Sequence, residues 1–216
     1  MEQSLAGHGP RAEGYPREAA ARHLWGDAPA LLARGRLLVV PTDTVYGMVC
    51  DPTDSAAVER LYAAKARPAG LELPVLGADL DALAELVELS PAARRAAAVH
   101  WPGPLTIVAR LREPLRLAVP RAGTSLAVRV PAHPLLRSLL WITGPLASSS
   151  ANPHGVPAPA HAAEAVGILG NVVAAAYDGG PAAGRASTII DCTASPPRVL
   201  RVGALSEADL RPHLEG

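Results

Sequence analysis

Apolar residues occur along this chain in two patterns. Short runs of Leu, Val and Ile, bounded by Gly, Pro or polar residues, predict strands, and apolar residues spaced three or four apart predict helices. The expected strands are residues 37–40, 73–76, 105–111, 126–130, 146–148, 172–176, 187–191 and 199–202. The expected helices are residues 18–33, 55–66, 79–89, 90–100, 134–141, 160–169 and 206–214.

The order of these elements indicates the fold class. Helices and strands are mixed, but several strands follow one another too closely to have a helix between each pair. The sequence therefore predicts a single α/β domain, with a twisted sheet of parallel and antiparallel strands flanked by helices. Residues 1–16 are rich in Gly, Pro and charge and are expected to form a flexible tail. Residues 17–216 are expected to form the domain.

Capping residues precede three of the expected helices. Asp54 or Ser55 is a suitable N-cap for the helix over 55–66, and Ser90 stands just before a proline at the next helix start. Ser206 is followed three positions later by Asp209, which approximates a capping box.

Composition excludes several classes of protein. The chain has 216 residues, of which 49% are hydrophobic, enough for one sizeable core, but it has no apolar run long enough to span a membrane. The formal net charge is zero, which argues against strong unspecific binding to nucleic acid. Cys50 and Cys192 lie far apart, so we expect neither a disulfide framework nor a zinc site, and a reducing cytoplasm as the location. The scattered histidines predict no dedicated metal site.

One cation stands out in this composition. Lys65 is the only lysine among the 20 Lys and Arg residues, and Arg67 follows two positions later at the end of an expected helix. Lysine is a compact point charge where arginine is a planar fork, so a lone lysine suggests a position that arginine cannot fill. The pair is either a clamp for phosphate or a simple cap of the helix dipole.

Two further polar segments follow expected strands. Residues 42–46 contain Thr42, Asp43 and Thr44, and residues 148–152 read Ser-Ser-Ser-Ala-Asn. Each segment is either an ordinary turn or a ligand-binding loop. The second would offer hydroxyls, an amide and free backbone N–H groups to a nucleotide. The glycine-rich phosphate loop, the dinucleotide fingerprint and the nucleophile elbow are all absent from the sequence.

Taken in order, a series of short motifs resembles the YrdC/TsaC family, the threonylcarbamoyl-AMP synthases. The similarity runs from about residue 20 to residue 205 and includes a Lys-x-Arg…Ser-x-Asn signature. The motifs are Pro41–Gly47, Lys65–Pro68, Trp101–Thr106, Ala127–Pro131, Ser150–Asn152, Asp178–Gly180, Ser187–Asp191 and Arg201–Gly203.

The resemblance implies a fold and a reaction. The fold is a YrdC-like twisted mixed sheet around a large concave pocket. The activity is that of an L-threonylcarbamoyladenylate synthase, a nucleotidyltransferase that makes threonylcarbamoyl-AMP and pyrophosphate from L-threonine, bicarbonate and ATP. A threonylcarbamoyl transferase complex then passes the group to an adenosine of tRNA, and Mg²⁺ is carried on the ATP phosphates.

The resemblance also implies site residues. Lys65 and Arg67 would be catalytic and would face the triphosphate, offsetting charge as pyrophosphate leaves. The ATP-binding set is Lys65, Arg67, Ser125, Asn152 and Arg201. The L-threonine set is Thr44, Arg129, Ser150 and Ser187. An arginine suits a carboxylate through a two-pronged bond.

The sequence departs from the family pattern at two places, and two other functions stay open. Many relatives carry an Asn and a His where this chain has Leu71–Leu76, and hydroxyls where it has Ala158 and Ala160. One alternative is a carbamoyltransferase-type domain that handles carbamoyl-adenylate and acts on another amine. The other is a non-catalytic module that binds RNA.

Overall fold

The fold is taken from a computed structural model, which describes residues 25–66, 72–112, 115–119, 123–153 and 155–214. The tail expected over residues 1–16 lies outside these ranges. In chain order the helices are α2 (Ala28–Ala33), α3 (Ser55–Ala64), α4 (Leu80–Ala84), α5 (Pro91–His100), α6 (Pro134–Thr143), α7 (Ala162–Leu169), the 3₁₀ turn η1 (Gly170–Val172) and α8 (Glu207–Leu214). The strands are β1 (Leu37–Val40), β2 (Gly47–Cys50), β3 (Val75–Leu76), β4 (Val87–Glu88), β5 (Leu105–Leu111), β6 (Ser125–Arg129), β7 (Leu146–Ser150), β8 (Val173–Ala176), β9 (Thr188–Asp191) and β10 (Arg198–Arg201).

Most expected elements are present, and two local predictions were wrong. No strand was expected over Gly47–Cys50, yet β2 forms there between β1 and β7. The helix expected over 79–89 ends at Ala84, and Val87 pairs with Leu111 as part of β4. Leu83, Leu86 and Val87 are all buried, so their spacing fits a helix as well as a turn into a strand. The sheet partner, which periodicity does not reveal, decides between the two.

The described strands form one sheet in the order β10-β9-β5-β6-β3-β7-β2-β1-β8, with β4 paired to β5. The pairs β1–β8, β3–β6 and β5–β9 are parallel. The pairs β1–β2, β2–β7, β3–β7, β5–β6 and β9–β10 are antiparallel. The mixed sheet predicted from the sequence is therefore confirmed.

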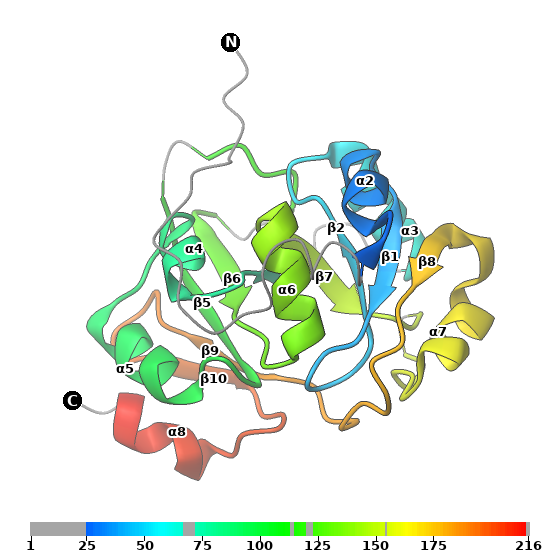
Figure 1. Cartoon of the computed structure of the whole chain (residues 1–216). Coiled ribbons are helices and arrows are strands. Elements are labelled where there is room, and N and C mark those ends of the chain that lie inside the picture. The colour runs from blue at the N-terminus through cyan, green and yellow to red at the C-terminus, as the bar shows by residue number, and fades with distance from the viewer. Residues whose placement is uncertain (1–24, 67–71, 113–114, 120–122, 154, 215–216) are drawn as a thin grey trace.

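Helices cover the two faces of this sheet unequally (Figure 1). Helices α3, α4, α5, α7 and α8 contribute to the main hydrophobic cluster, which also takes one side of β2, β5 and β6. Helices α2 and α6 form a second cluster on the opposite face, with Trp25 at its centre. That second cluster uses side chains of β1, β2, β3 and β7, but its residues do not include any from β5, β6, β9 or β10. The half of this face formed by β5, β6, β9 and β10 therefore lies outside the second cluster.

The expected helix caps are confirmed. Asp54 accepts a hydrogen bond from the backbone N–H of Ala57 at 3.0 Å, which starts α3. Ser90 accepts from Ala93 at 3.3 Å and starts α5. Ahead of α8, Asp209 accepts from the Ser206 N–H at 2.8 Å and the Ser206 hydroxyl accepts from the Asp209 N–H at 3.3 Å, which is a reciprocal capping box.

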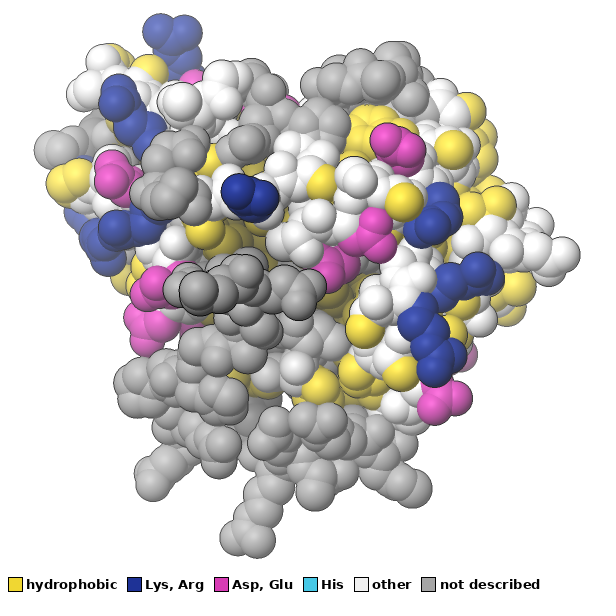
Figure 2. Space-filling model, turned by 90° about the horizontal axis from the view of Figure 1, so that it is seen from above, with side chains coloured by type: hydrophobic (Ala, Val, Ile, Leu, Met, Phe, Trp, Pro, Cys, Tyr) yellow, Lys and Arg dark blue, Asp and Glu magenta, His cyan; other side chains and the backbone are white. Residues whose placement is uncertain are grey.

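On the face seen in Figure 2, the charged side chains of the described residues are dispersed. Figure 2 shows Lys and Arg in separate groups on one face, with acidic, polar and hydrophobic side chains between them. This distribution agrees with the zero net charge of the sequence. Within the described ranges, no helix is both long and apolar enough to cross a membrane.

Candidate active site

The half of the sheet face that α2 and α6 do not pack against carries a row of polar side chains. In a strand, alternate residues point to opposite faces. On β6, Leu126 and Val128 belong to the main hydrophobic cluster, so Ser125 and Arg129 point to the other face. In the register between β3 and β6, Arg129 lies opposite Leu76, which belongs to the second cluster. Ser125 and Arg129 therefore lie on the face of the sheet that α2 and α6 pack against.

The neighbouring strands extend this polar row, which we call the polar face. On β5, Leu105 and Ile107 belong to the main cluster, so Thr106 and Arg110 point to the polar face. Arg201 of β10 lies opposite Ile189, which in turn pairs with Thr106. Strand alternation and register alone therefore bring together side chains from four strands on one surface.

Strand register places Ser125 and Ser150 at one edge of the sheet. Val128, Val75 and Ala147 form a row across β6, β3 and β7. Ser125 lies three residues before that row on β6, and Ser150 lies three residues after it on β7, which runs the opposite way. Both side chains consequently lie at the same edge and on the polar face.

Lys65 is held at this edge by the loop that follows β7. Its Nζ donates to the Ser150 carbonyl at 2.7 Å and the Asn152 carbonyl at 2.6 Å. The Ser150 hydroxyl lies at 3.0 Å and the Asn152 side-chain oxygen at 3.4 Å. The side chain is only 4% exposed although it ends helix α3. We call Lys65, Ser150 and Asn152 the Lys65 cluster.

The loop of the Lys65 cluster differs from its prediction in one respect. Its backbone N–H groups were expected to be free for a nucleotide. Instead the Ala151 N–H donates to the Tyr46 carbonyl at 2.8 Å, and the Asn152 N–H donates to the Ser150 carbonyl at 2.9 Å. The reason is that buried backbone donors must find partners, and this loop is buried at Ala151 and Asn152. The loop can therefore offer its side chains to a ligand, but not these two backbone N–H groups.

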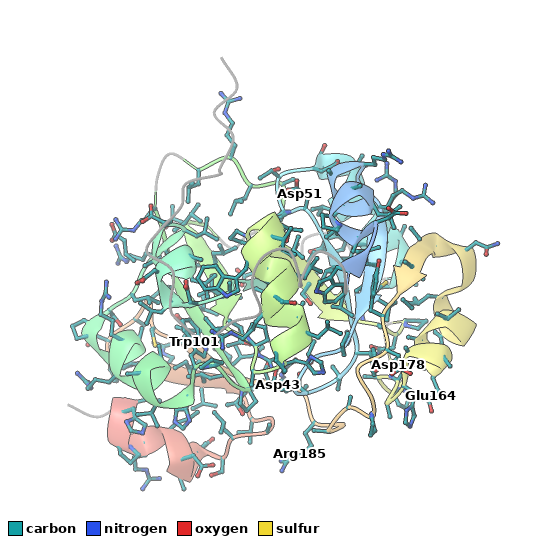
Figure 3. The ribbon with its side chains drawn as sticks, viewed as in Figure 1. Asp43, Asp51, Trp101, Glu164, Asp178 and Arg185 are labelled. Atoms are coloured by element: carbon teal, nitrogen blue, oxygen red, sulfur yellow. The ribbon has the colours of Figure 1, made fainter. Side chains whose placement is uncertain are left out.

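Arg129 is the centre of a second group of contacts, which we call the Arg129 cluster. Its Nη2 donates to Asp43 Oδ1 at 2.7 Å, its Nη1 donates to the Thr44 hydroxyl at 3.0 Å, and its Nε donates to the Gly103 carbonyl at 2.9 Å. The loop between β1 and β2 thus reaches Arg129 at the far end of β6. Figure 3 shows Asp43 at the end of α6, between Trp101 and Asp178 in that view.

The surroundings of Arg129 disfavour its charge, and Asp43 compensates. Burial lowers the pKa of the Arg129 guanidinium, Asp43 raises it through charge and hydrogen bonding, and Arg201 lowers it further. Arginine stays protonated across ordinary pH, so the consequence is a need for a counter-charge. The ion pair with Asp43, whose side chain is 17% exposed against 8% for Arg129, supplies it.

The hydroxyl of Thr44 has hydrogen-bonding capacity left for a ligand. Thr42 Oγ1 donates to the Val45 carbonyl at 2.6 Å and lies 2.9 Å from Thr44 Oγ1. It also accepts from the backbone N–H groups of Thr44 at 3.0 Å and Val45 at 3.1 Å, which occupy both of its lone pairs, so the Thr44 proton is not required there. The Thr44 hydroxyl accepts from Arg129 and can still donate to a ligand or accept from it.

Ser187, Thr106 and Arg201 form a third group, the Ser187 cluster. The hydroxyls of Ser187 and Thr106 are 2.9 Å apart. Arg201 Nη2 donates to the Ser187 carbonyl at 2.9 Å and lies 3.3 Å from its hydroxyl. Ser187 and Thr106 are buried and Arg201 is exposed. The exposed end of the cluster is therefore cationic.

Tyr46 and the loop after β8 join these groups. The Tyr46 hydroxyl lies 3.0 Å from Asp178 Oδ1 and 2.7 Å from the Gly180 carbonyl, and it accepts from the Gly179 N–H at 3.1 Å. Farther along the same loop, the Gly184 N–H donates to the Thr44 carbonyl at 2.8 Å. The segment carrying Asp43 and Thr44 is thus fixed on two sides.

One pocket in the described part of the structure lies outside these three clusters. It has a volume of about 300 Å³ and is lined by Glu88, Leu89, Ser90, Arg110, Cys192, Thr193, Ala194 and Ser195. Its lining does not include any of the site residues expected from the sequence, although Arg110 is the register partner of Ser125. The polar face is the better candidate for the active site, because three groups of contacts between segments far apart in the sequence lie there.

Comparison with known proteins assigns the family. The profile of the Sua5/YciO/YrdC family, described as "Telomere recombination", matches residues 30–203. The chain belongs to this family. A curated threonylcarbamoyl-AMP synthase of Mycobacterium leprae, named as putative, is 40% identical over 183 residues, which are 84% of this chain and 83% of the relative. The family prediction from the sequence motifs is confirmed.

Two longer members of the Sua5/YciO/YrdC family match as well. The threonylcarbamoyl-AMP synthase of Bacillus subtilis is 34% identical over 85% of this chain and 54% of its own length. The structure of Pyrococcus abyssi Sua5 complexed with L-threonine superposes with a TM-score of 0.82 at 33% identity. That match covers 94% of this chain and 59% of the other. The YrdC-like fold is therefore confirmed too.

The structure brings most of the expected site residues together, and it adds others. Arg67 lies outside the described residues, and strand register puts Ser125 on the same face as the three clusters. Asp43, Gly103 and Thr106 were not among the expected site residues. Each stands inside one of the family motifs quoted above, which was the only signal available in the sequence.

Proposed function

We propose that this chain is an L-threonylcarbamoyladenylate synthase, which forms threonylcarbamoyl-AMP and pyrophosphate from L-threonine, bicarbonate and ATP. The observation that carries the proposal is the Lys65 cluster, where the two halves of the Lys-x-Arg…Ser-x-Asn signature meet across 85 residues of sequence. The names of the curated relatives and the L-threonine complex of Pyrococcus abyssi Sua5 support it.

In the proposed reaction, the amine of L-threonine and bicarbonate combine to a carbamate with loss of water. A carbamate oxygen then attacks the α-phosphorus of ATP, the bond between the α- and β-phosphates breaks, and pyrophosphate leaves. Little covalent work is required of the protein, so position and charge supply the rate enhancement. The polar face supplies both.

Lys65, Arg67, Ser125, Asn152 and Arg201 are proposed to bind ATP, with Lys65 and Arg67 offsetting the charge on the leaving pyrophosphate. An ammonium has three N–H bonds. In this structure two of them meet the carbonyls of Ser150 and Asn152, and the Ser150 hydroxyl, 3.0 Å from the same nitrogen, takes the third. A phosphate oxygen must therefore replace or share one of these partners. We expect nucleotide binding to move the loop over residues 150–152.

Thr44, Arg129, Ser150 and Ser187 are proposed to bind L-threonine. Protein groups use one N–H on each of the three nitrogens of Arg129, which leaves one on Nη1 and one on Nη2 for a carboxylate. The Thr44 hydroxyl, which accepts from Arg129, would contact the substrate as well. The polar face thus offers cationic and hydroxyl groups suited to an amino acid beside a nucleotide.

The Mg²⁺ that accompanies ATP would be held by phosphate oxygens and water rather than by a protein cage. In the part of the chain that the structure describes, no group of three or more His, Cys, Asp or Glu side chains is placed to hold a metal ion. Bound in this way, the ion would neutralise part of the triphosphate charge, and Lys65 and Arg201 would act on the remaining phosphate oxygens.

The product is proposed to pass to a threonylcarbamoyl transferase complex, which would modify an adenosine of tRNA. We propose the cytoplasm as the location. Cys50 and Cys192 are free and buried, and burial raises the pKa of each thiol to about 12. Thiols kept neutral and unpaired in this way support a reducing compartment.

The test is release of pyrophosphate from ATP in the presence of bicarbonate, Mg²⁺ and each amino acid in turn. Release that requires L-threonine and is lost in Lys65→Ala supports the proposal. Release with another amine would retain the adenylation chemistry and change the substrate. No release with any amino acid would contradict the proposed activity.

A further inference from the structure

The loop between β1 and β2 carries a carboxylate that the sequence comparison did not assign to the site. Asp43 Oδ1 accepts two hydrogen bonds, from Arg129 Nη2 at 2.7 Å and from the Ala132 N–H at 3.0 Å. Arg129 ends strand β6, and Ala132 lies in the segment just beyond it. One oxygen therefore ties the loop to both sides of the point where β6 ends.

Asp43 is one of three groups that fix the plane of the Arg129 guanidinium. The others are the Gly103 carbonyl on Nε and the Thr44 hydroxyl on Nη1. They come from two separate segments, the loop between β1 and β2 and the segment ahead of β5, so the orientation of Arg129 depends on both. A planar group bound at each of its nitrogens has one orientation, and its two remaining N–H bonds then point in fixed directions.

The three contacts are not equivalent, because only Asp43 carries charge. Arg129 is 6% exposed, and burial lowers the pKa of its guanidinium while Asp43 raises it. A buried cation whose counter-ion is removed must find another or let water in. The Gly103 carbonyl and the Thr44 hydroxyl are neutral, so they cannot supply the counter-charge.

Resting on the function proposed above, we propose that Asp43 is a positioning residue that holds Arg129 in the orientation required by the amino-acid substrate. It acts through Arg129, which belongs to the set proposed to bind L-threonine, whereas Lys65, Asn152 and Arg201 are the residues of the three clusters proposed to bind ATP. Loss of its charge therefore affects the amino acid more than the nucleotide.

The experiment compares wild type, Asp43→Asn, Arg129→Lys and the double variant in steady-state kinetics. Asp43→Asn keeps the size of the side chain and removes its charge. We expect kcat/KM for L-threonine to fall by about 10-fold or more, as small errors of orientation cost at least that much, while the KM for ATP stays within about twofold. In the Arg129→Lys background, Asp43→Asn should have little further effect.

Asp51→Asn is the matched control. Asp51 also braces a turn, accepting from the N–H and the hydroxyl of Thr53 at 2.8 and 2.7 Å, but it lies at the opposite end of the molecule from Asp43 (Figure 3). We expect its kinetics to equal those of wild type. An Asp43→Asn enzyme with unchanged kcat/KM for L-threonine, equal losses for both substrates, or a full additional loss in the double variant would each overturn the proposal.

Two measurements that do not need turnover separate this proposal from the proposed function. In NMR spectra, the Nε–H signal of Arg129, identified by its loss in Arg129→Lys, should be protected from exchange in wild type and in Asp51→Asn but not in Asp43→Asn. Calorimetry should show weaker binding of L-threonine to Asp43→Asn. If wild type released no pyrophosphate yet both results held, the function would fail and the positioning role would stand. An unchanged Arg129 signal in Asp43→Asn would overturn the role even in an active enzyme.

Discussion

Lys65 sits in a set of contacts that suits an ammonium group. Two carbonyl oxygens, of Ser150 and Asn152, lie 2.7 and 2.6 Å from one nitrogen. A guanidinium spreads its charge and its donors over three nitrogens and cannot bring both carbonyls to one of them without moving the loop. This geometry explains why lysine occurs here in a chain that otherwise uses arginine.

We therefore predict that Lys65→Arg is not a conservative change. It should lower kcat/KM for ATP by about 100-fold, close to the effect of removing a group that stabilises developing charge. The matched control is Arg60→Lys in the middle of the same helix, where the exposed Arg60 donates from Nη1 to the Gly35 carbonyl. Steady-state kinetics of both variants provide the check, and equal activities of Lys65→Arg and wild type would contradict the prediction.

Tyr46→Phe should destabilise the protein without changing any charge. The Tyr46 hydroxyl accepts from the Gly179 N–H and meets Asp178 and the Gly180 carbonyl. Its removal takes this partner from the Gly179 N–H and the Gly180 carbonyl in a partly buried place, whereas Asp178 Oδ1 keeps the Gly180 N–H. We therefore expect the free energy of unfolding to fall by about 1–3 kcal/mol. Urea denaturation measures this, with Tyr177→Phe, which loses the bond to the Trp25 carbonyl, as a comparison. An unchanged midpoint would count against the proposed link between the two loops.

For single residues, the sequence indicated some of the contacts in the candidate site and not others. Lys65 was singled out by being the lone lysine, and the resemblance put it with Asn152 in the ATP-binding set. Its contact with Ser150 was not predicted. Asp43 was not distinguishable from an ordinary turn residue, because its role depends on Arg129, which lies 86 residues away in the chain. The saturation of the loop amides at Ala151 and Asn152 was equally hidden, since backbone partners depend on tertiary packing.

Among the elements, the end of β10 is held tightly against the start of β9. A Cβ atom added to Gly203 would lie 2.5 Å from the Ser187 carbonyl oxygen and would also clash with the Ala186 carbonyl. These are backbone atoms, which cannot turn away as a side chain can. The position of Ser187, and through it Arg201, thus depends on a glycine at 203.

Gly203→Ala should accordingly reduce both stability and activity. We expect a loss of about 1–3 kcal/mol in the free energy of unfolding, typical of overpacking, together with lower kcat/KM for both substrates. Gly167→Ala is the control, since a Cβ there would meet no atom within 4 Å. That change in helix α7 should stabilise by about 0.5–1 kcal/mol. Thermal unfolding of both variants measures the difference, and a stable, fully active Gly203→Ala would contradict the account.

Helices α5 and α8 meet through a histidine pair whose protonation affects stability. The rings of His100 and His213 lie edge to face with centroids 5.3 Å apart. Burial lowers the pKa of His100 below its ordinary value of 6.5, His213 lowers it further, and Asp209 opposes this. Among the described residues, no hydrogen-bond partner is found for the buried His100 Nε2.

The sign of the pH effect follows from this direction. Because the folded protein binds the His100 proton less tightly than the unfolded chain, the unfolded chain takes up more protons as pH falls below about 6.5. We predict that stability declines from about pH 6.5 down to the folded pKa of His100 and that His100→Gln reduces the decline. Urea denaturation between pH 5 and 8 tests this, and identical slopes for wild type and variant would exclude His100 as the cause.

The elements show where periodicity is sufficient and where it is not. Strands such as β1 and β5, buried along nearly their whole length, were predicted from apolar runs. The two-residue strands β3 and β4 lie below the length that periodicity can resolve, and only β3 fell within an expected strand. The missed strand β2 begins with Gly47, which is close to β7 and read as part of a turn.

For the whole molecule, the class of fold followed from the order of elements, but the position of the site did not. The polar face exists because α2 and α6 cover one half of a sheet face and leave Arg129, Thr106 and their neighbours on the other. Which strands lie next to one another is set by long-range pairing, such as β5 with β9, and the sequence alone does not give this order. Family motifs supplied the site residues in its place.

The dispersed charges in Figure 2 and the zero net charge favour an enzyme of small substrates over a module that binds RNA through its phosphates. The most direct test of that central claim is the identity of the product. Purified protein would be incubated with ATP, Mg²⁺, L-threonine and ¹³C-bicarbonate, and the nucleotides analysed by mass spectrometry. We predict threonylcarbamoyl-AMP that carries the ¹³C label and is absent without L-threonine or with Lys65→Ala. ATP left intact, or an adenylate without the label, would contradict the account.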